Sequence, residues 1–218
     1  MKLFFKILVF WIIGISILAA QTDINQYNLF EEFEEGLVYY KDGRQFTVPL
    51  NYNIVNQQFL FIDKNDNNTI KAFAEPDLVT LVKVGERLFL HDKKEIKEVV
   101  QMEPPITVQY KPKIREKGKR AGYGGYSETS AIENISGIQS GGIYYKFEGE
   151  NNIILSRVEK IYHIVHDRKK QKFINEKTFL KIYSKQKESL KQYIDKNKIN
   201  FNSIDQVIQL CNYAGGLK

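Results

Sequence analysis

Hydrophobic and polar residues alternate along much of the first half of the chain, which is the pattern of half-buried β-strands. The clearest case is QFTVPLNYNI at 45–54, whose apolar face holds Phe46, Val48, Leu50, Tyr52 and Ile54. Pro49 on the opposite face predicts an edge or a bulge, because proline has no N–H to donate to a strand ladder. Similar short runs occupy 36–40, 58–62, 69–73, 78–84, 87–91, 95–102 and 106–110.

Turn residues separate these runs. Asp42-Gly43 is a strong hairpin signal, and both Gly85-Glu86 and Lys93-Lys94 are typical of tight connections. Eight short strands joined by brief turns favour an antiparallel β-meander over residues 21–110, closed or half-closed as a half-barrel. Because no helices alternate with the strands, the pattern disfavours a Rossmann-type parallel sheet.

The last part of the chain has a different period. After apolar segments at 143–147 and 152–165, which predict further strands, HDRKK at 166–170 reads as a polar turn. Three helical faces follow, with Asn175, Ser184 and Ser203 as expected N-caps. Their inward-facing residues are Phe179, Leu180 and Tyr183, then Leu190, Tyr193 and Ile194, then Ile204, Val207, Ile208 and Cys211. The predicted fold is therefore α+β: a meander, a Gly-rich loop, further strands and a short helical tail.

Residues 111–142 lack a sustained apolar period and are rich in Lys at the start and in Gly and Ser later. This composition predicts a basic loop or linker between the β region at 21–110 and the strands and helices at 143–218. Its RAGYGGYSETS stretch, 120–130, does not match a Walker loop or a complete dinucleotide fingerprint. Two interpretations of this stretch are compatible with the sequence: a loosely packed linker and a loop that contacts a ligand.

The N-terminus predicts the compartment. Lys2 and Lys6 precede an uncharged apolar run that ends at Ala19-Ala20, the pattern of a secretory signal peptide over residues 1–20. The run is shorter than the roughly 20 residues of a spanning helix. We expect an exported protein, periplasmic or associated with the outer surface, with no membrane span after cleavage. An uncleaved anchor is the alternative.

The distribution of charge and the single cysteine limit the possible surfaces and cross-links of the protein. Residues 21–110 hold 9 Lys and Arg against 15 Asp and Glu, whereas residues 111–218 hold 21 against 11. An acidic first half and a basic second half suggest two surfaces with different tasks, or mutual attraction between the halves.

Cys211 is the only cysteine, so no disulfide can form within the chain. We expect it to be buried on its helix, with an intermolecular disulfide or a reactive thiol as alternatives.

The basic loop supplies the candidate binding residues. Cations attract anionic polymers or lipid headgroups, and tyrosines offer flat surfaces that carry a hydroxyl. The predicted ligand contacts are Arg115, Lys117, Lys119, Arg120, Tyr123 and Tyr126. In an exported protein the expected partners are an acidic polysaccharide, lipopolysaccharide, anionic lipid or an envelope protein, and not nucleic acid. DRKKQK at 167–172 would extend this surface if it folds nearby.

Other chemistry has weaker support. His163 and His166 would lie on opposite faces of a strand, and no third zinc ligand stands near them. DKNDNNTI at 63–70 partly matches a calcium loop, but Asn68 and Ala74 replace the glycine and the bidentate carboxylate, so a hairpin turn is favoured. No catalytic set, metal site or cofactor is predicted.

The chain resembles small exported proteins of AT-rich Gram-negative bacteria whose functions are not known. The resemblance lies in the signal ending in Ala-Gln, the EGLVYYKDG…LNYN hairpin, the Gly-rich middle and the Phe/Tyr-rich helical tail. It implies export and the β-then-α order, and supplies no activity. The leading hypothesis is a cell-envelope binding module. The alternatives are a periplasmic hydrolase that uses His91, His163 or His166, and a signal-anchored structural partner.

Overall fold

The computed structural model describes residues 27–92, 95–116 and 153–217 of the chain. Within them, ten strands form one sheet and three α-helices follow the last strand, which confirms the α+β class. The strands are β1 (Glu34–Tyr40), β2 (Gln45–Asn53), β3 (Gln58–Asp63), β4 (Thr69–Ala72), β5 (Val79–Val84), β6 (Arg87–Asp92), β7 (Glu95–Gln101), β8 (Ile106–Glu116), β9 (Ile153–His166) and β10 (Lys169–Phe173). The helices are α2 (Glu176–Ile182), α3 (Lys187–Asn197) and α4 (Ile204–Gly216), with single 3-10 turns η3 (Pro76–Leu78) and η5 (Ser184–Gln186).

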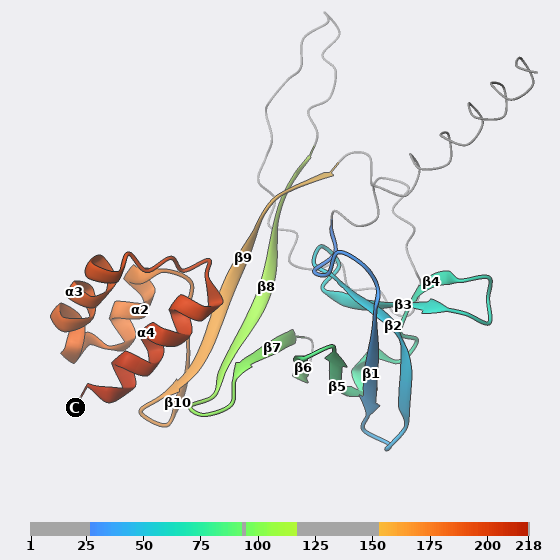
Figure 1. Cartoon of the computed structure of the whole chain (residues 1–218), viewed down its shortest axis with the longest axis horizontal. Coiled ribbons are helices and arrows are strands. Elements are labelled where there is room, and N and C mark those ends of the chain that lie inside the picture. The colour runs from blue at the N-terminus through green and yellow to red at the C-terminus, as the bar shows by residue number, and fades with distance from the viewer. Residues whose placement is uncertain (1–26, 93–94, 117–152, 218) are drawn as a thin grey trace, which may run out of the picture.

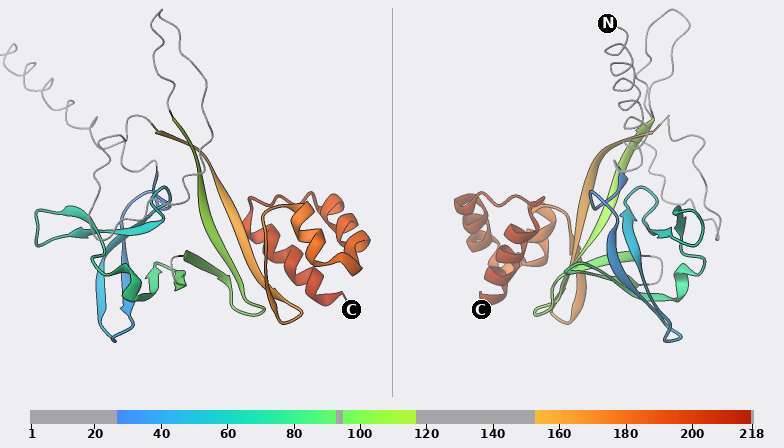
Figure 2. Two further views of the ribbon diagram at one scale, coloured as in Figure 1. Left: turned by 180° about the vertical axis from the view of Figure 1, so that it is seen from behind. Right: turned by 45° about the vertical axis from the view of Figure 1, so that its right-hand side comes forward.

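The sheet consists of two meanders. Its strand order is β10-β9-β8-β7-β6-β5-β1-β2-β3-β4, so β5 to β10 form one meander, β1 to β4 form the other, and the β1–β5 pair joins them. Figures 1 and 2 show β1 to β4 at one end of the molecule and the helices at the other, with the long strands β8 and β9 between. A barrel requires its outermost strands to pair, but β4 and β10 lie at opposite ends of the order. The predicted closed or half-closed barrel is therefore wrong, and the meander is confirmed.

The turns explain why these segments fold back on themselves. Gly43 has a φ of 87° between β1 and β2, which confirms the predicted hairpin turn at Asp42-Gly43. Gly85 has a φ of 54° between β5 and β6. Positive φ at both central residues is the geometry of a type I′ turn. It occurs at Asp167 and Arg168 between β9 and β10, and two adjacent residues with positive φ, Asn67 and Asn68, also lie between β3 and β4. Lys93-Lys94 lies outside the described residues.

Pro49 occupies the kind of position expected from the sequence. It pairs with Glu35 of β1, whereas the pairing of β2 with β3 begins only at Leu50. The missing proline N–H therefore lies where β2 has one neighbour in the ladder.

Strand β8 is longer than predicted. It continues from the expected end at Tyr110 to Glu116, and residues 111–116 pair with β9 as far as Ile153. The expectation that the loop begins at Lys111 is wrong, because a partner strand from a distant segment stabilises residues that carry no apolar run of their own. The rest of the predicted loop, 117–142, lies outside the described residues.

One face of the sheet, the inner face, carries the core. Residues directly opposite each other on β6 to β10 share this face, and the row runs through Phe89, Glu98, Val108, Tyr162 and Phe173. Towards β1 to β4 the ring of Phe89 packs on that of Phe59 with centroids 5.2 Å apart. Towards the helices the ring of Phe173 packs on Phe179 of α2 at 4.9 Å. The core is therefore continuous from the first strands to the helical tail.

The helical tail begins and ends largely as expected. The Asn175 side chain accepts from the Thr178 backbone N–H at 3.0 Å, which confirms the predicted cap of α2. The predicted cap at Ser203 is also confirmed, since its hydroxyl accepts from the Gln206 N–H. Ser184 does not cap α3; it begins η5, and Gln186 precedes α3 without a side-chain cap. None of the helices in the described residues is long and apolar enough to cross a membrane.

Cys211 is buried on the inner side of α4, as predicted. Burial raises the pKa of its thiol to about 12, so the thiolate required of a nucleophile is strongly disfavoured.

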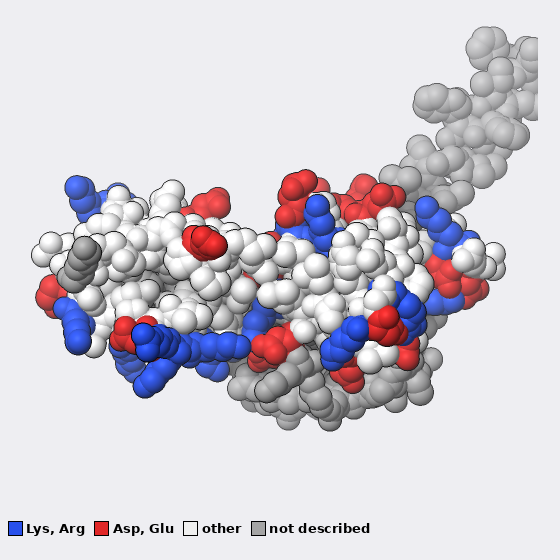
Figure 3. Space-filling view, turned by 90° about the horizontal axis from the view of Figure 1, so that it is seen from below, with Lys and Arg blue, Asp and Glu red and all other residues white. Residues whose placement is uncertain are grey.

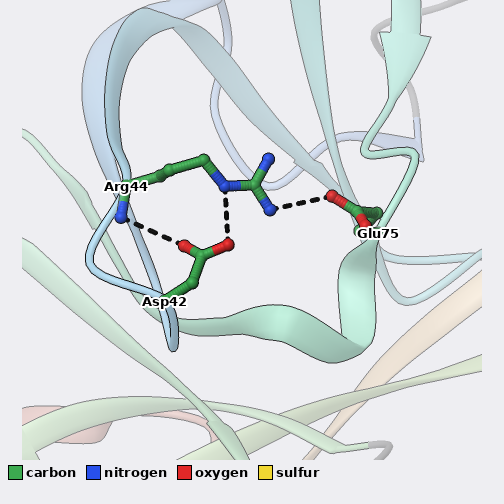
Figure 4. Close-up of polar contacts among 3 residues, drawn as sticks. All are labelled: Asp42, Arg44 and Glu75. Carbon is green, nitrogen blue, oxygen red and sulfur yellow. Dashed lines mark hydrogen bonds and ion pairs between the residues drawn. The ribbon is translucent and has the colours of Figure 1, made fainter.

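A polar cluster ties the first hairpin to the connection before β5. Asp42 in the β1–β2 turn accepts from the Arg44 guanidinium at 2.7 Å, and Glu75 accepts from the same guanidinium at 2.9 Å (Figure 4). The backbone N–H of Arg44, with its guanidinium, lowers the pKa of Asp42. All three side chains are more than two-fifths exposed, so the cluster fixes local geometry and adds little stability.

Candidate functional site

Only one of the six predicted contact residues lies in the described part of the chain. Arg115 is exposed near the end of β8. Lys117, Lys119, Arg120, Tyr123 and Tyr126 lie outside the described residues, so their role stays a prediction.

The structure places Arg115 on a larger cationic surface. Side chains on β8, β9 and β10 alternate between the inner face and the opposite face, on which none of the described helices lies (Figure 1). We call this opposite face of β8 to β10 the cationic face. Its basic residues are Lys111, Lys113, Arg115, Arg157, Lys170 and Lys172. From Arg157 to Val165 it extends for roughly 25 Å along β9, at the usual rise per strand residue.

Like charges lie directly opposite each other on this face. Lys113 pairs across the ladder with Arg157. Such pairs are unfavourable unless an anion relieves them. Glu159 offers partial relief, with its carboxylate 3.6 Å from the Lys113 ammonium. Among the described residues, Arg157, Lys170 and Lys172 have no ion-pair partner, so they are available to an external anion.

The charge asymmetry of the sequence is also an asymmetry in space. Residues 153–217 hold 13 Lys and Arg against 6 Asp and Glu, whereas residues 27–92 hold 6 against 11. These segments form opposite ends of the molecule (Figure 1). In Figure 3, seen from below, blue side chains gather at the helical end, while red and blue are mixed at the other. The two ends therefore present different potentials to a charged partner.

His163 lies in the middle of the cationic face. Its Nε2 atom is buried and finds no hydrogen-bond partner among the described residues. Burial lowers the pKa of this imidazole, and the nearby charges of Lys97 and Lys172 lower it further, against a smaller opposing effect of Glu95. The neutral ring is thus the favoured form in the folded protein.

The three histidines are not gathered into one site. His166 lies on the inner face with its ring 4.3 Å from that of Tyr183, whereas His163 lies on the cationic face. His91 of β6 contacts the carbonyl oxygen of Val79 at 3.2 Å, and burial lowers its pKa. The described residues hold no group of three or more His, Cys, Asp and Glu that could bind a metal ion.

The loop that partly resembled a calcium site is a hairpin turn between β3 and β4, as favoured. Its carboxylates, Asp63 and Asp66, both contact the Lys71 ammonium, at 2.8 and 2.7 Å.

The inner face holds a polar cluster that the sequence analysis missed. The Arg87 guanidinium donates to both carboxylate oxygens of Glu98, at 2.7 and 2.8 Å. The Tyr110 hydroxyl also donates to Glu98, and Arg87 lies over the ring of Phe30 at 4.7 Å. Burial, with the neighbouring Glu98, raises the pKa of Tyr110 well above its usual range. A charged residue on the apolar face of an alternating strand was the available signal, since Glu98 lies between Ile96 and Val100.

This cluster is better suited to stabilising the fold than to catalysing a reaction. The Glu98 carboxylate has both oxygens occupied and the residue is only 6% exposed. Lys160 extends the polar row towards the helices, where its ammonium donates to the carbonyl of Asn202. Burial lowers the pKa of Lys160.

Comparison with protein-family models, with curated proteins and with solved structures gave no match to this chain. Its function is therefore inferred from its own residues and their arrangement.

Proposed function

We propose that the protein is an exported, non-enzymatic binding module of the cell envelope that holds an anionic polymer or an anionic lipid surface on its cationic face. The observation that carries the proposal is the direct opposition of Lys113 and Arg157, together with Lys170 and Lys172 on the same face, which have no ion-pair partner among the described residues. A fold tolerates opposed like charges most readily where a ligand neutralises them.

The spacing of these cations suits a repeating polyanion. Neighbouring strands lie about 4.8 Å apart, and alternate residues on one strand about 6.6 Å apart. Both distances are shorter than the Debye length of about 8 Å at physiological salt. Successive anionic groups of a polymer or of packed headgroups can therefore interact with several cations together. The predicted contacts at 117–126 follow β8 directly in the sequence.

The test replaces Lys113, Arg157, Lys170 and Lys172 together by Gln in the chain from Gln21 onward, which keeps every residue of the described fold. Binding is measured by isothermal titration calorimetry against a sulfated polysaccharide and against vesicles that contain phosphatidylglycerol. At about 1 kcal/mol for each charge near an anionic surface, we expect a loss of affinity of at least 100-fold. Raising the salt concentration should weaken wild-type binding in the same direction.

The matched control replaces the same number of exposed lysines on the helical side, Lys185, Lys187, Lys191 and Lys196, by Gln. It removes an equal charge and should retain most of the affinity. Equal losses in the two variants would show that only net charge matters, and the proposed site would be wrong. Wild-type protein that binds neither ligand at low salt would contradict the proposed function itself.

A further inference from the structure

The strands β8 and β9 extend beyond the rest of the sheet as a two-stranded arm. β7 pairs with β8 only between Ile106 and Val108, and β10 pairs with β9 only from Tyr162 onward. Residues 111–116 and 153–159 pair only with each other among the described residues, and we call them the arm. Figure 1 shows this ribbon projecting past the other strands.

The two faces of the arm differ in chemistry. One face belongs to the cationic face and carries Lys111, Lys113, Arg115 and Arg157. The other face carries apolar residues: Pro112 lies opposite Val158, and Ile114 lies opposite Leu155. A bulge between Lys113 and Ile114 keeps Leu155 on the apolar face. The Ser156 hydroxyl donates to the Lys113 carbonyl oxygen at 2.7 Å beside it.

Only part of the apolar face of the arm packs against the core of the protein. Val158 packs against the core cluster, whereas Ile114 and Leu155 are only partly buried and do not belong to that cluster of the described residues. A two-stranded ribbon is marginally stable in water without further support. A cross-strand apolar pair at a projecting position is therefore a surface that gains from a partner.

We infer that the arm docks on an anionic lipid surface, with Ile114 and Leu155 entering the headgroup boundary and with Lys113, Arg115 and Arg157, on the other face of the same thin ribbon, reaching the phosphates beside it. This deepens the proposed function and rests on it. A soluble acidic polysaccharide is neutralised by cations alone and offers nothing for an apolar pair to enter. Amphipathic elements with basic residues on one face and apolar residues on the other lie in the membrane interface. Long Lys and Arg stems reach from the polar face to the headgroups.

The experiment separates the apolar contribution from the charge. Ile114→Ser and Leu155→Ser are introduced together in the chain from Gln21 onward, and binding is compared on phosphatidylcholine vesicles with and without phosphatidylglycerol. Losing two partly buried aliphatic contacts should weaken binding to the anionic vesicles about tenfold or more. Affinity for the soluble sulfated polysaccharide should stay within about twofold, because the cations are unchanged.

Leu90→Ser with Met102→Ser is the matched control, since these apolar residues are 40% and 64% exposed and lie outside both the arm and the cationic face. It should leave vesicle binding unchanged, and circular dichroism checks that both double variants fold. The lipid inference is overturned if the arm variant binds anionic vesicles as wild type does, or if wild type binds the polysaccharide but no vesicle. In both cases the proposed function stands; it fails only if wild type binds neither ligand.

Discussion

Glu98 shows how a single buried charge is retained at the middle of the sheet. Its carboxylate accepts two hydrogen bonds from Arg87 and a third from Tyr110. The rings of Phe30 and Phe89 lie 4.7 and 5.4 Å from the guanidinium. Both carboxylate oxygens thus have a donor, and such hydrogen bonds are what allows a buried ion pair to be tolerated. The cluster links β6, β7 and β8 under the N-terminal segment.

Replacing Glu98 by Gln should destabilise the protein by about 2 kcal/mol, less than the roughly 3–5 kcal/mol of a fully buried pair, because Arg87 is partly exposed. The measurement is urea unfolding followed by circular dichroism. Tyr110→Phe is the control, since it keeps the bidentate pair and should lose only about 1 kcal/mol. A smaller effect for Glu98→Gln than for Tyr110→Phe would show that the ion pair is not the main contribution.

Gly36 decides how closely β1 approaches its neighbours. A Cβ atom at this position would lie 2.6 Å from Cδ1 of Leu50 and 2.8 Å from the carbonyl oxygen of Lys83. β1 is the strand that joins the two meanders, since it pairs with both β2 and β5. A side chain there would push apart the junction on which the ten-stranded sheet depends.

Gly36→Ala should lower the free energy of unfolding by about 1–3 kcal/mol, because backbone atoms on β5 cannot move aside cheaply. Thermal melting monitored by circular dichroism measures the change. Gly215→Ala is the control with the opposite expected sign: α4 has no neighbour within 4 Å of a Cβ there, and alanine favours a helix by up to about 1 kcal/mol. Equal melting temperatures for wild type and Gly36→Ala would contradict the close approach.

The described part of the molecule forms one structural unit, although its two ends differ. The hydrogen-bonded ladder runs unbroken from β4 to β10, and the inner face carries one core cluster from Phe30 to Ala214. The N-terminal strands and the helical tail therefore share a core, although they differ in charge. This favours cooperative unfolding over independent melting of the two ends.

Phe179→Ala tests this cooperativity from the helical end. The fully buried ring contacts Phe173 and Tyr183, and its loss should destabilise the protein by about 3–5 kcal/mol. We expect a single calorimetric transition at a lower temperature than in the wild type. The helix and sheet signals in circular dichroism should change together at that temperature. Tyr213→Ala at an exposed position serves as the mild control. A separate early transition confined to the helical signal would contradict a single unit.

Local patterns were sufficient for much of the fold. Period-two alternation located the eight strands before Glu116, and glycine at 43 and 85 located two of their turns. The capping side chains at Asn175 and Ser203 located two helix starts. These features depend on residues within a few positions of each other, which is why a single sequence is enough to predict them. Ser184 misled because a hydroxyl before an apolar face also fits a 3-10 turn.

The candidate sites could be anticipated only in part. Arg115 was identified from its basic surroundings, but the opposition of Lys113 and Arg157 depends on the register of strands that are 44 residues apart. The Arg87–Glu98–Tyr110 cluster likewise needs three strands to be aligned before its members meet.

By itself, the sequence determined the α+β class, most strand and helix positions, the burial of Cys211 and the charge difference between the two halves. Each of these follows from local periodicity or composition. The tertiary structure alone decided that the sheet is open, that β1 joins two meanders, and that β8 and β9 form an arm with one cationic and one apolar face. These depend on which distant strands pair and in which register, and a shift of one residue would exchange the two faces.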